Sequence, residues 1–527
     1  MKSFNTSVVC VPEKHYMVDM TGRVNRIIDS LIQENKYFTI SRARQFGKTT
    51  ILSLLRRALK PEFYVLAISF AGRSSMFDTE ASFVRGFVRK LRIAMKNEGM
   101  EAVLVDAFSA EIADEDAFGE LDERITELCR NSDREIILTI DEVNQSTNNQ
   151  ITVDFLALLR DKYIRRETEG DHTFKSVILA GVYDIKNLQI KIRPREQHRY
   201  NSPWNVAADY NINMLFGTEE IAKMLSEYKA DHGLDFDEDW FAGQIYSYTS
   251  GYPFMVSRIC QLLDEVVTRE KELGSVRNAW TLNGFFRAIK IFVEEDNTLF
   301  DDLEKKLNDY SDLRELMYRV IVSRESVPYS KGNGAIRLGD AFCWLKNEQG
   351  KVVVFNRIFE TRIYNLFIDE KSANPLYQMA SLEKNDLKND AELNMDLIME
   401  RFMVHYQSIY GTRSADFLEN EAVLIFLTFL KPVINGYGNY YIEAETADKT
   451  KTDIVVDYKS KQYIIEAKVW HGRKYQEAGI SQLAGYLERY HQEKGWLLTF
   501  CFNKNKEKLV GSHDLESNGK RIREVIV

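Results

Sequence analysis

Short apolar runs alternate with amphipathic segments through the first third of the chain. Three runs are almost wholly apolar and predict strands buried on both faces: FYVLAISF at 63–70, EIILTIDE at 135–142 and SVILAGVYD at 176–184. Residues 36–43 (KYFTISRA) predict another strand, and SFVRGFVRKLRIAM at 82–95 has apolar residues at helical spacing. Strands separated by helices predict an α/β fold with a parallel sheet that helices cover on both faces.

The middle of the chain changes to helical patterns without strand alternation. Segments 217–228 and 246–267 are both helical in pattern, which predicts a helical lid over 226–294 on a sheet domain formed by 1–225. Residues 295–370 mix helical patterns with two short strands around an Asn-Glu-Gln-Gly turn. We expect a winged-helix-like module there.

Strands return in the last part of the chain. The polar, charged run SLEKNDLKNDAELN indicates a linker or an exposed helical edge, and we place the linker at 371–395. Beyond it, an apolar helix (DFLENEAVLIFLTFLKP) precedes three strands (NYYIEAET, TDIVVDY and QYIIEAKVW) and a further helix through ISQLAGYLERYHQ. This order predicts a second α/β domain at 396–527.

Composition describes a folded protein of several domains. A chain of 527 residues is too long for one core, and 44% hydrophobic residues with 8 prolines argue against disorder. The net charge of −9 favours solubility and still permits nucleic-acid binding through a local basic surface. The 5 cysteines lack CxxC spacing, which excludes a zinc cluster of that type and a disulfide framework. No segment has the length of a membrane span, so we expect a cytoplasmic protein without a membrane partner.

The stretch RARQFGKTT, residues 42–50, lies between the first predicted strand and a helix. Phosphate binding at such a turn needs inward backbone N–H groups, a lysine for the outer phosphates and a hydroxyl for magnesium. Gly47, Lys48 and Thr49 supply all three. Arg42 stands where such loops place glycine, and a surface lysine at a helix N-terminus is the alternative interpretation. The neighbouring residues complete the expected cofactor-binding set: Arg44, Gln45, Phe46 and Thr50.

An acidic pair ends the strand at 135–142. An acidic residue at a strand tip can hold magnesium through water, and its neighbour can orient the attacking water. Asp141 and Glu142 fit these two roles. Acidic residues also end strands without any function, but here the phosphate-loop pattern and the acidic pair occur in order on suitable strands. Together they predict ATP and Mg2+ as cofactors.

These residues resemble the bacterial AAA-ATPase-like family, which is related to the STAND and archaeal ATPases. The likeness covers residues 10–370 and rests on YMVDM, YFTISRARQFGKTT, LTIDEVN, ILAGVYDI, SPWNVAADY and YTSGYPFMVSRIC. It implies a P-loop NTPase sheet with a helical lid and a winged-helix-like module. Members of the family carry Arg-rich loops that end in Gly-Lys-Ser/Thr, which accommodates Arg42.

The same resemblance implies a role for each residue of the site. Lys48 would meet the β and γ phosphates, Thr49 and Asp141 would hold magnesium, and Glu142 would position water. Pro253, in SGYP, would lie near adenine. Three arginines are candidate charge stabilisers, although each is otherwise a solvated surface charge: Arg193, Arg195 and Arg258.

A second group of residues lies on the C-terminal strands. Asp453 begins one strand, and Glu466 and Lys468 lie two apart on the next, so that they share one face. Phosphodiester hydrolysis at neutral pH needs a hard cation held by carboxylates and a water nucleophile. The two acids can supply the metal ligands, and the lysine can orient water or offset negative charge. A cross-strand ion pair is the alternative, but Gln482 and Tyr486, at i and i+4 on the following helix, favour catalysis.

This D-x12-E-x-K pattern followed by Q-x3-Y resembles the PD-(D/E)XK nuclease superfamily over residues 396–527. The likeness implies a restriction-endonuclease-like α/β domain with Asp453 and Glu466 as metal ligands. Its catalytic set would be completed by Lys468, Gln482 and Tyr486. Many members add a glutamate from the first helix, and Glu419 and Glu421 both remain candidates.

The two resemblances predict an enzyme that binds and hydrolyses ATP and gates a Mg-dependent nuclease, with DNA as the expected nucleic acid. One alternative is a nucleotide-switched sensor or DNA-binding regulator whose nuclease fold binds without cutting. Another is an interaction scaffold with a purely structural ATP site. Strand preference, the biological trigger and the oligomeric state stay open, a homo-oligomer being one option.

Overall fold

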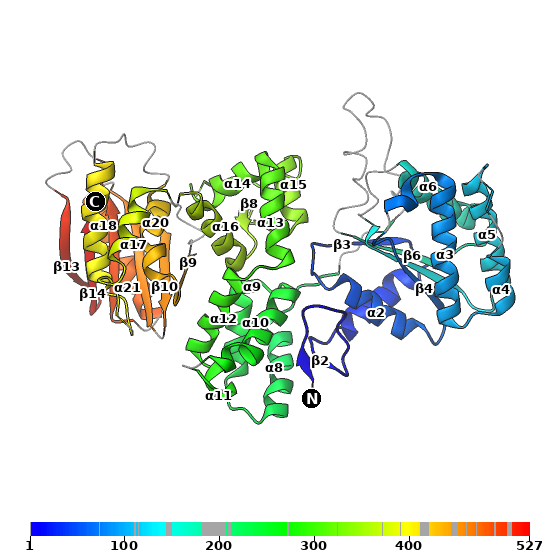
Figure 1. Cartoon of the computed structure of the whole chain (residues 1–527), viewed down its shortest axis with the longest axis horizontal. Helices are drawn as coiled ribbons and strands as arrows, with labels where there is room; N and C mark the ends of the chain where they lie inside the picture. The colour runs from blue at the N-terminus through cyan, green and yellow to red at the C-terminus, as the bar shows by residue number, and fades with distance from the viewer. Residues whose placement is uncertain are drawn as a thin grey trace. The chain divides into compact units, whose positions relative to one another are not determined.

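The computed structural model divides into two compact units, whose helices and strands are labelled in Figure 1. The first comprises Met1–Met224 with Tyr252–Phe254, and the second comprises Leu225–Gly251 with Met255–Val527. The structure describes residues 2–72, 74–109, 112–113, 115–143, 150–181, 207–208, 212–270, 273–323, 325–371, 373–389, 391–411, 421–443, 452–459, 461–470, 472–489, 492–502 and 509–527. Among the helices in these ranges, none combines the length and the apolar character needed to cross a membrane.

The first unit is built on a parallel sheet in the order β3-β6-β5-β4. Its strands are β3 (Phe38–Ser41), β4 (Tyr64–Ser69), β5 (Ile136–Asp141) and β6 (Ser176–Gly181). The predicted α/β fold with a parallel sheet is therefore confirmed for this part of the chain. Because the strands are parallel, their carboxyl ends meet at one edge, where ligands of such sheets bind.

Helices cover this sheet because each has one apolar face. The helices α3 (Glu80–Glu98), α5 (Ala117–Asn131) and α6 (Gln150–Glu169) share one core with β4, β5 and β6. The helix α2 (Lys48–Leu59) contacts β4 and β6. The smaller elements of the unit are β1 (Ser3–Phe4), β2 (His15–Tyr16), α1 (Thr21–Ile27), the π-helix Ile28–Ile32, a 3-10 turn at Ser74–Phe77 and α4 (Ala102–Ala107).

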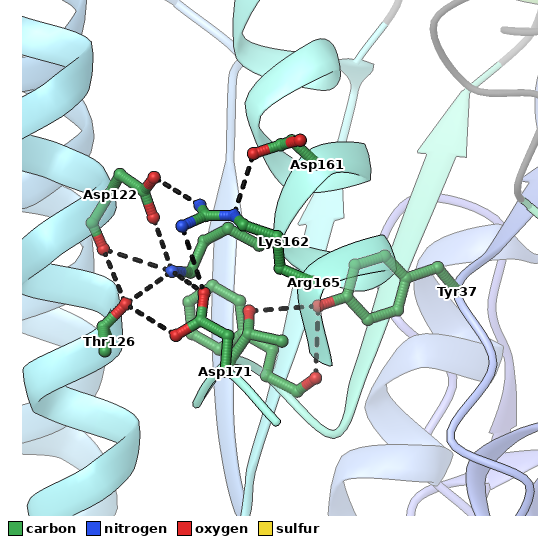
Figure 2. Close-up of polar contacts among 9 residues, drawn as sticks. Tyr37, Asp122, Thr126, Asp161, Lys162, Arg165 and Asp171 are labelled. Atoms are coloured by element: carbon green, nitrogen blue, oxygen red, sulfur yellow. Dashed lines mark hydrogen bonds and ion pairs between the residues drawn. The ribbon is translucent and has the colours of Figure 1, made fainter. Parts of the chain in front are cut away.

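A buried lysine ties three segments of the first unit together (Figure 2). The ammonium of Lys162, on α6, lies 2.5 Å from Asp122 Oδ1, 2.6 Å from Thr126 Oγ1 and 3.2 Å from Asp171 Oδ2. The side chain is fully buried, and a buried charge persists only where it is paired. Asp171 precedes β6, so the cluster lies at the amino ends of the strands, away from the edge where ligands bind. We assign it a structural role.

The second unit begins with helices. They are α8 (Thr218–His232), which starts in the first unit, α9 (Glu238–Thr249), α10 (Pro253–Glu265), the 3-10 turn Val267–Arg269, α11 (Val276–Ala279) and α12 (Leu282–Glu294). The helical pattern at 246–267 is interrupted, because Ser250 and Gly251 have φ of +48° and +74°. A left-handed pair cannot continue a right-handed helix, so α9 ends and α10 begins anew at Pro253.

A helical segment with one hairpin follows. Its elements are α13 (Thr298–Asp309), α14 (Ser311–Ile321), α15 (Gly334–Ala341), β7 (Leu345–Glu348), β8 (Lys351–Val354) and α16 (Arg357–Asp369). The antiparallel pair β7–β8 turns through Gln349 and Gly350, with φ of +50° and +82°. Two left-handed residues make the tight turn that suits a twisted hairpin, as the Asn-Glu-Gln-Gly pattern predicted.

In the described residues, the C-terminal sheet has six strands in the order β13-β14-β12-β11-β10-β9. They are β9 (Gly438–Glu443), β10 (Thr452–Tyr458), β11 (Lys461–Val469), β12 (Lys494–Phe500), β13 (Gly511–Ser517) and β14 (Lys520–Ile526). One face meets α18 (Met395–Tyr410), whose Phe402 ring lies 6.2 Å from that of Phe500. The other face shares an apolar core with α21 (Arg473–Arg489). The helix α20 (Ala422–Ile434) packs with Phe402 through Phe426.

Part of the range 371–395, predicted as a linker or an exposed helical edge, is helical. The helix α17 (Pro375–Glu383) lies in this range and contacts α20. Leu376 and Ala380 on α17, and Leu387 after it, are fully buried. Charged residues gather in the run SLEKNDLKNDAELN, but a few apolar residues at helical spacing are enough to fix the segment against a neighbouring helix.

Candidate functional site

The predicted phosphate loop lies between the carboxyl end of β3 and the first turn of α2. Gln45 and Gly47 have φ of +54° and +79°, and Phe46 between them keeps a negative φ. Loops in which left-handed residues alternate with residues of negative φ can turn successive N–H groups toward one side, the arrangement of an anion-binding nest. Gly47 adopts its conformation without strain, whereas Gln45 holds one that is uncommon for a residue with a side chain.

Lys48 closes this loop from the inside. Its ammonium donates to the carbonyl oxygens of Arg42 at 3.0 Å and Ala43 at 2.7 Å, and its side chain is buried. The lysine therefore points back over the loop and not into solvent. This position excludes the alternative of a surface lysine at a helix N-terminus.

The structure brings Thr49 and Asp141 together across 92 positions of sequence. Thr49 Oγ1 donates to Asp141 Oδ2 at 2.7 Å, and Asp141 Oδ1 accepts from the Glu142 amide at 2.8 Å. Glu142 has φ of +58°, a conformation that clusters at functional sites when the surroundings enforce it. A hydroxyl beside a carboxylate is the oxygen donor set that Mg2+ prefers, so these residues fit the predicted cation.

The hydrogen bonds of Arg42 explain how the loop accommodates arginine at a position where such loops have glycine. Its amide donates to the Gly181 carbonyl at the end of β6 at 3.1 Å. Its guanidinium donates to the carbonyl oxygens of Ser41 at 2.8 Å and Ile212 at 3.2 Å. The side chain thus braces the start of the loop from outside and leaves the inner surface to the backbone.

Residues from distant segments support the loop, and the sequence did not reveal them. The Tyr252 hydroxyl donates to the Arg44 carbonyl, and its ring packs edge-on against Phe46 with centroids 4.9 Å apart. The Thr50 hydroxyl accepts from the Cys10 amide at 3.3 Å. Tyr252 precedes Pro253, so the SGYP segment reaches the loop through its tyrosine.

Of the three arginines predicted as candidate charge stabilisers, the structure describes Arg258. Arg258 is engaged by Glu295, with Nη2 2.7 Å from Oε2 and Nε donating to both carboxylate oxygens. Its guanidinium also contacts Gln261 at 2.7 Å. Arg193 and Arg195 lie outside the described residues. Arg258 is therefore a structural ion-pair partner in this conformation.

The second candidate site lies on the face of the C-terminal sheet that α21 covers. Antiparallel register places Asp453 of β10 directly opposite Glu466 of β11. The spacing predicted a shared face for Glu466 and Lys468. Directly opposed residues also share one face of a sheet, so position 453 lies on that face too. The side chain of Asp453 lies outside the described part of the structure.

Glu466 and Lys468 form a buried ion pair. The Lys468 ammonium lies 3.1 Å from Glu466 Oε1, and both side chains are almost completely buried. The α21 helix packs over them, with Tyr486 buried in its apolar core and a side-chain oxygen of Gln482 shielded from solvent. Glu466, Lys468, Gln482 and Tyr486 therefore lie between this sheet face and α21.

The upstream glutamates do not join this pair in the described residues. Glu421 accepts hydrogen bonds from the Tyr318 hydroxyl and, at 3.0 Å, from the Lys371 ammonium. Both of its oxygens are thus engaged by the helical segment. Glu419 lies outside the described residues. Among the side chains that are described, no three His, Cys, Asp or Glu gather into a metal-binding group.

A further buried carboxylate, Glu524 on β14, lies on the same sheet face and was not predicted. Gln476 of α21 donates to its Oε2 at 2.6 Å, and Thr499 of β12 donates to its Oε1 at 3.3 Å. Burial raises the pKa of Glu524 above its ordinary value, and the two hydrogen bonds oppose this shift. Thr499 is in register with Lys468, so this carboxylate lies two strands from the ion pair.

Comparison with known proteins gives remote structural likeness only. No family model and no curated protein sequence matches the chain. A Walker-type ATPase of Pyrococcus abyssi is similar over 68% of this chain and 99% of its own, with 14% identity and a TM-score of 0.45. The ORC2 protein of Aeropyrum pernix is 8% identical over 70% of this chain and 98% of its own, with a TM-score of 0.41. The RuvB Holliday junction branch migration motor of Thermotoga maritima is 11% identical over 64% and 90%, with a TM-score of 0.33.

The first unit has an α/β fold with a parallel sheet. At these TM-scores, the interpretation of the site depends on its own geometry. A strand, a loop with left-handed residues, a lysine folded over that loop and a Thr–Asp contact occur together.

Proposed function

We propose that this chain binds and hydrolyses ATP at the β3–α2 loop and cleaves nucleic acid at the β10–β11 face of its C-terminal sheet. The single observation that carries the first activity is the hydrogen bond between Thr49 and Asp141. A phosphate-loop hydroxyl and a strand-tip carboxylate in contact are the donors that a nucleotide-bound Mg2+ needs.

Each residue of the loop has a defined task in this proposal. The N–H groups around Gln45 and Gly47 bind phosphate oxygens, and Lys48 leaves the carbonyls of Arg42 and Ala43 to neutralise the outer phosphates. Glu142 orients the attacking water and accepts its proton. When bound, magnesium would be held by Thr49 and Asp141 and would offset the charge that develops on the phosphates.

The proposed nuclease activity is supported by the Glu466–Lys468 pair and by the register of Asp453. Asp453 and Glu466 would hold the metal, which would polarise the scissile phosphate. Lys468 orients the attacking water or stabilises the negative charge of the transition state. Gln482 and Tyr486 brace the pair from α21, and DNA is the proposed substrate.

A regulator that binds DNA without cutting it is the second candidate. One observation favours it: the Lys468 ammonium lies 3.1 Å from the Glu466 carboxylate, which is also the geometry of a structural ion pair. A regulator of this kind would keep nucleotide binding and DNA binding but would lack cleavage under every metal condition.

The decisive experiment measures both reactions on one protein preparation. Phosphate release from ATP and cleavage of labelled single- and double-stranded DNA and RNA are followed with Mg2+, with Mn2+ and with EDTA. We expect Lys48→Ala to abolish ATP turnover and Asp453→Ala or Glu466→Ala to abolish cleavage. Cleavage that persists in both acid variants would refute the nuclease assignment, and turnover that persists in Lys48→Ala would refute the ATPase assignment.

A further inference from the structure

Gly479 of α21 lies against the Lys468 side chain. A Cβ atom at position 479 would come within 2.4 Å of Lys468 Nζ, 2.8 Å of Cε and 2.9 Å of Cδ. Real Cβ atoms do not approach other atoms so closely, so a side chain at 479 and the lysine in its present place exclude each other. The φ of Gly479 is an ordinary helical one, and therefore only this contact requires glycine.

Other contacts fix the height of α21 above the sheet at this point. One turn before Gly479, Gln476 donates to the buried Glu524 carboxylate at 2.6 Å. Leu483, one turn after it, and Tyr486, two turns after it, pack into the apolar core shared with the sheet. The helix is therefore held on both sides of Gly479 and cannot easily rise to make room for a larger residue.

Moving the Lys468 side chain out of its present position would be energetically unfavourable. Lys468 is almost fully buried, and its charge is paired with Glu466 at 3.1 Å. An ammonium that left this place would lose its partner, and a buried charge without its partner is strongly unfavourable. The space left by the missing side chain at 479 thus determines where the ammonium lies.

We infer that Gly479 is a positioning residue for the proposed nuclease: by lacking a side chain it holds the Lys468 ammonium beside Glu466, where the reaction requires it. This inference rests on the proposed function. Gly479 itself touches neither substrate nor metal in this account. Its effect on cleavage passes through the lysine alone.

A Gly479→Ala variant tests the inference, with Gly485→Ala as the matched control on the same helix. A Cβ at Gly485 would meet no atom within 4 Å. We expect Gly479→Ala to lower magnesium-dependent DNA cleavage at least tenfold and to leave ATP turnover unchanged. Gly485→Ala should leave both reactions unchanged. Equal cleavage by the Gly479→Ala variant and the wild type would overturn the inference.

Thermal unfolding tests whether glycine is required at position 479 because of the Lys468 side chain or for another structural reason. Alanine is the better helix former, so Gly485→Ala should raise Tm. Gly479→Ala should raise Tm clearly in a Lys468→Ala background, where the space is vacant, and less or not at all when the lysine is present. An identical Tm change in both backgrounds would overturn the inference. If Lys468→Ala does not fold, the same cycle is carried out with Glu466→Gln added throughout.

The two measurements distinguish this inference from the proposed function. Absence of cleavage by the wild-type protein would refute the nuclease assignment and, with it, the catalytic consequence of Gly479. Equal Tm changes in the two backgrounds, with cleavage intact in the wild type, would refute the role of Gly479 alone. Loss of cleavage in Gly479→Ala together with unequal Tm changes would support both.

Discussion

Burial changes the chemistry of one carboxyl group in the second unit, that of Asp457 on β10. Burial raises the pKa of Asp457 from 3.8 to about 7, against the opposing effects of Gln462, the Arg357 charge and Tyr248. Because the native pKa is the higher one, the native state holds the proton between these two values while the unfolded chain releases it. The free energy of unfolding therefore falls as pH rises from about 4 to about 7.

Asp457→Asn should remove this pH dependence. We expect the variant to unfold at a higher temperature than the wild type at pH 8, with a gain of up to about 4 kcal/mol, and to match it near pH 4. Thermal unfolding across this pH range measures the effect. The exposed Asp309 provides a control, Asp309→Asn. A difference between wild type and Asp457→Asn that is constant with pH would contradict the argument.

The buried Lys162 holds the first unit together through charge (Figure 2). Replacing it by methionine leaves Asp122 and Asp171 without this partner. Removal of one member of a buried pair destabilises a protein by about 3 kcal/mol or more. We expect Lys162→Met to lower the stability of the unit by this amount and to leave the Kd for ATP unchanged at a temperature where it is folded.

Denaturant unfolding and nucleotide titration together test the structural role of Lys162. The exposed Lys60 gives the control, since Lys60→Met should change stability by no more than about 0.5 kcal/mol. Unchanged stability in Lys162→Met would show that the cluster contributes nothing. A raised Kd for ATP in the folded variant would show that the cluster also serves the nucleotide site.

At the scale of elements, the turn before α10 supports the phosphate loop. The Tyr252 hydroxyl donates to the Arg44 carbonyl while its ring stays on Phe46. Tyr252→Phe removes only the hydrogen bond, which is worth about 1 kcal/mol, so the Kd for ATP should rise about fivefold. Isothermal titration measures it, with Tyr246→Phe, at an exposed position, as the control. Equal affinity in both variants would mean that the turn does not position the loop.

The hydrophobic pattern alone predicted those elements whose local sequence is sufficient to specify them. The apolar run at 135–142 corresponds to β5, in which five successive residues, Ile136 to Ile140, are buried. A strand that is buried on both faces gives a continuous apolar run, which is easy to recognise in the sequence. The Asn-Glu-Gln-Gly sequence became the β7–β8 turn, since turn geometry is set by local backbone preferences. These parts needed no tertiary information.

Other elements depended on partners far away in sequence. The strand β13 (GSHDLES) is partly exposed along its length and is a strand through its pairing with β14. The helix α17 is short, adjoins a charged run and is fixed by packing on α20. Neither short segment carries enough periodicity to reveal its partner.

Within the two sites, too, some residues could be predicted from local sequence and others depend on distant partners. The Thr49–Asp141 pair could be predicted, because Asp141 ends β5 and Thr49 lies in the first turn of the helix after β3, at the same edge of a parallel sheet. Tyr252 and Glu524 could not, because their roles arise from tertiary contacts with Arg44 and with Gln476. For Tyr252, the one clue in the sequence was its position directly before Pro253, which was predicted to lie near adenine.

At the scale of the whole molecule, each unit carries one proposed chemistry. The first unit holds the phosphate loop with Lys48, Thr49 and Asp141, and the second holds the Glu466–Lys468 pair. In the proposed mechanism, ATP turnover in the first unit gates cleavage in the second. Both sites use hard oxygen donors, so EDTA should stop ATP turnover and DNA cleavage alike, and added Mg2+ should restore both.

The most direct test of this account is a DNA-cleavage assay with Mg2+, with and without ATP, on the wild type, Lys48→Ala and Glu466→Gln. We predict ATP-dependent cleavage by the wild type and loss of that dependence, together with ATP turnover, in Lys48→Ala. Glu466→Gln should lose cleavage and keep ATP turnover within about twofold of the wild type, as expected for chemically independent sites. Undiminished cleavage by Glu466→Gln, or the same rate with and without ATP in the wild type, would contradict the account.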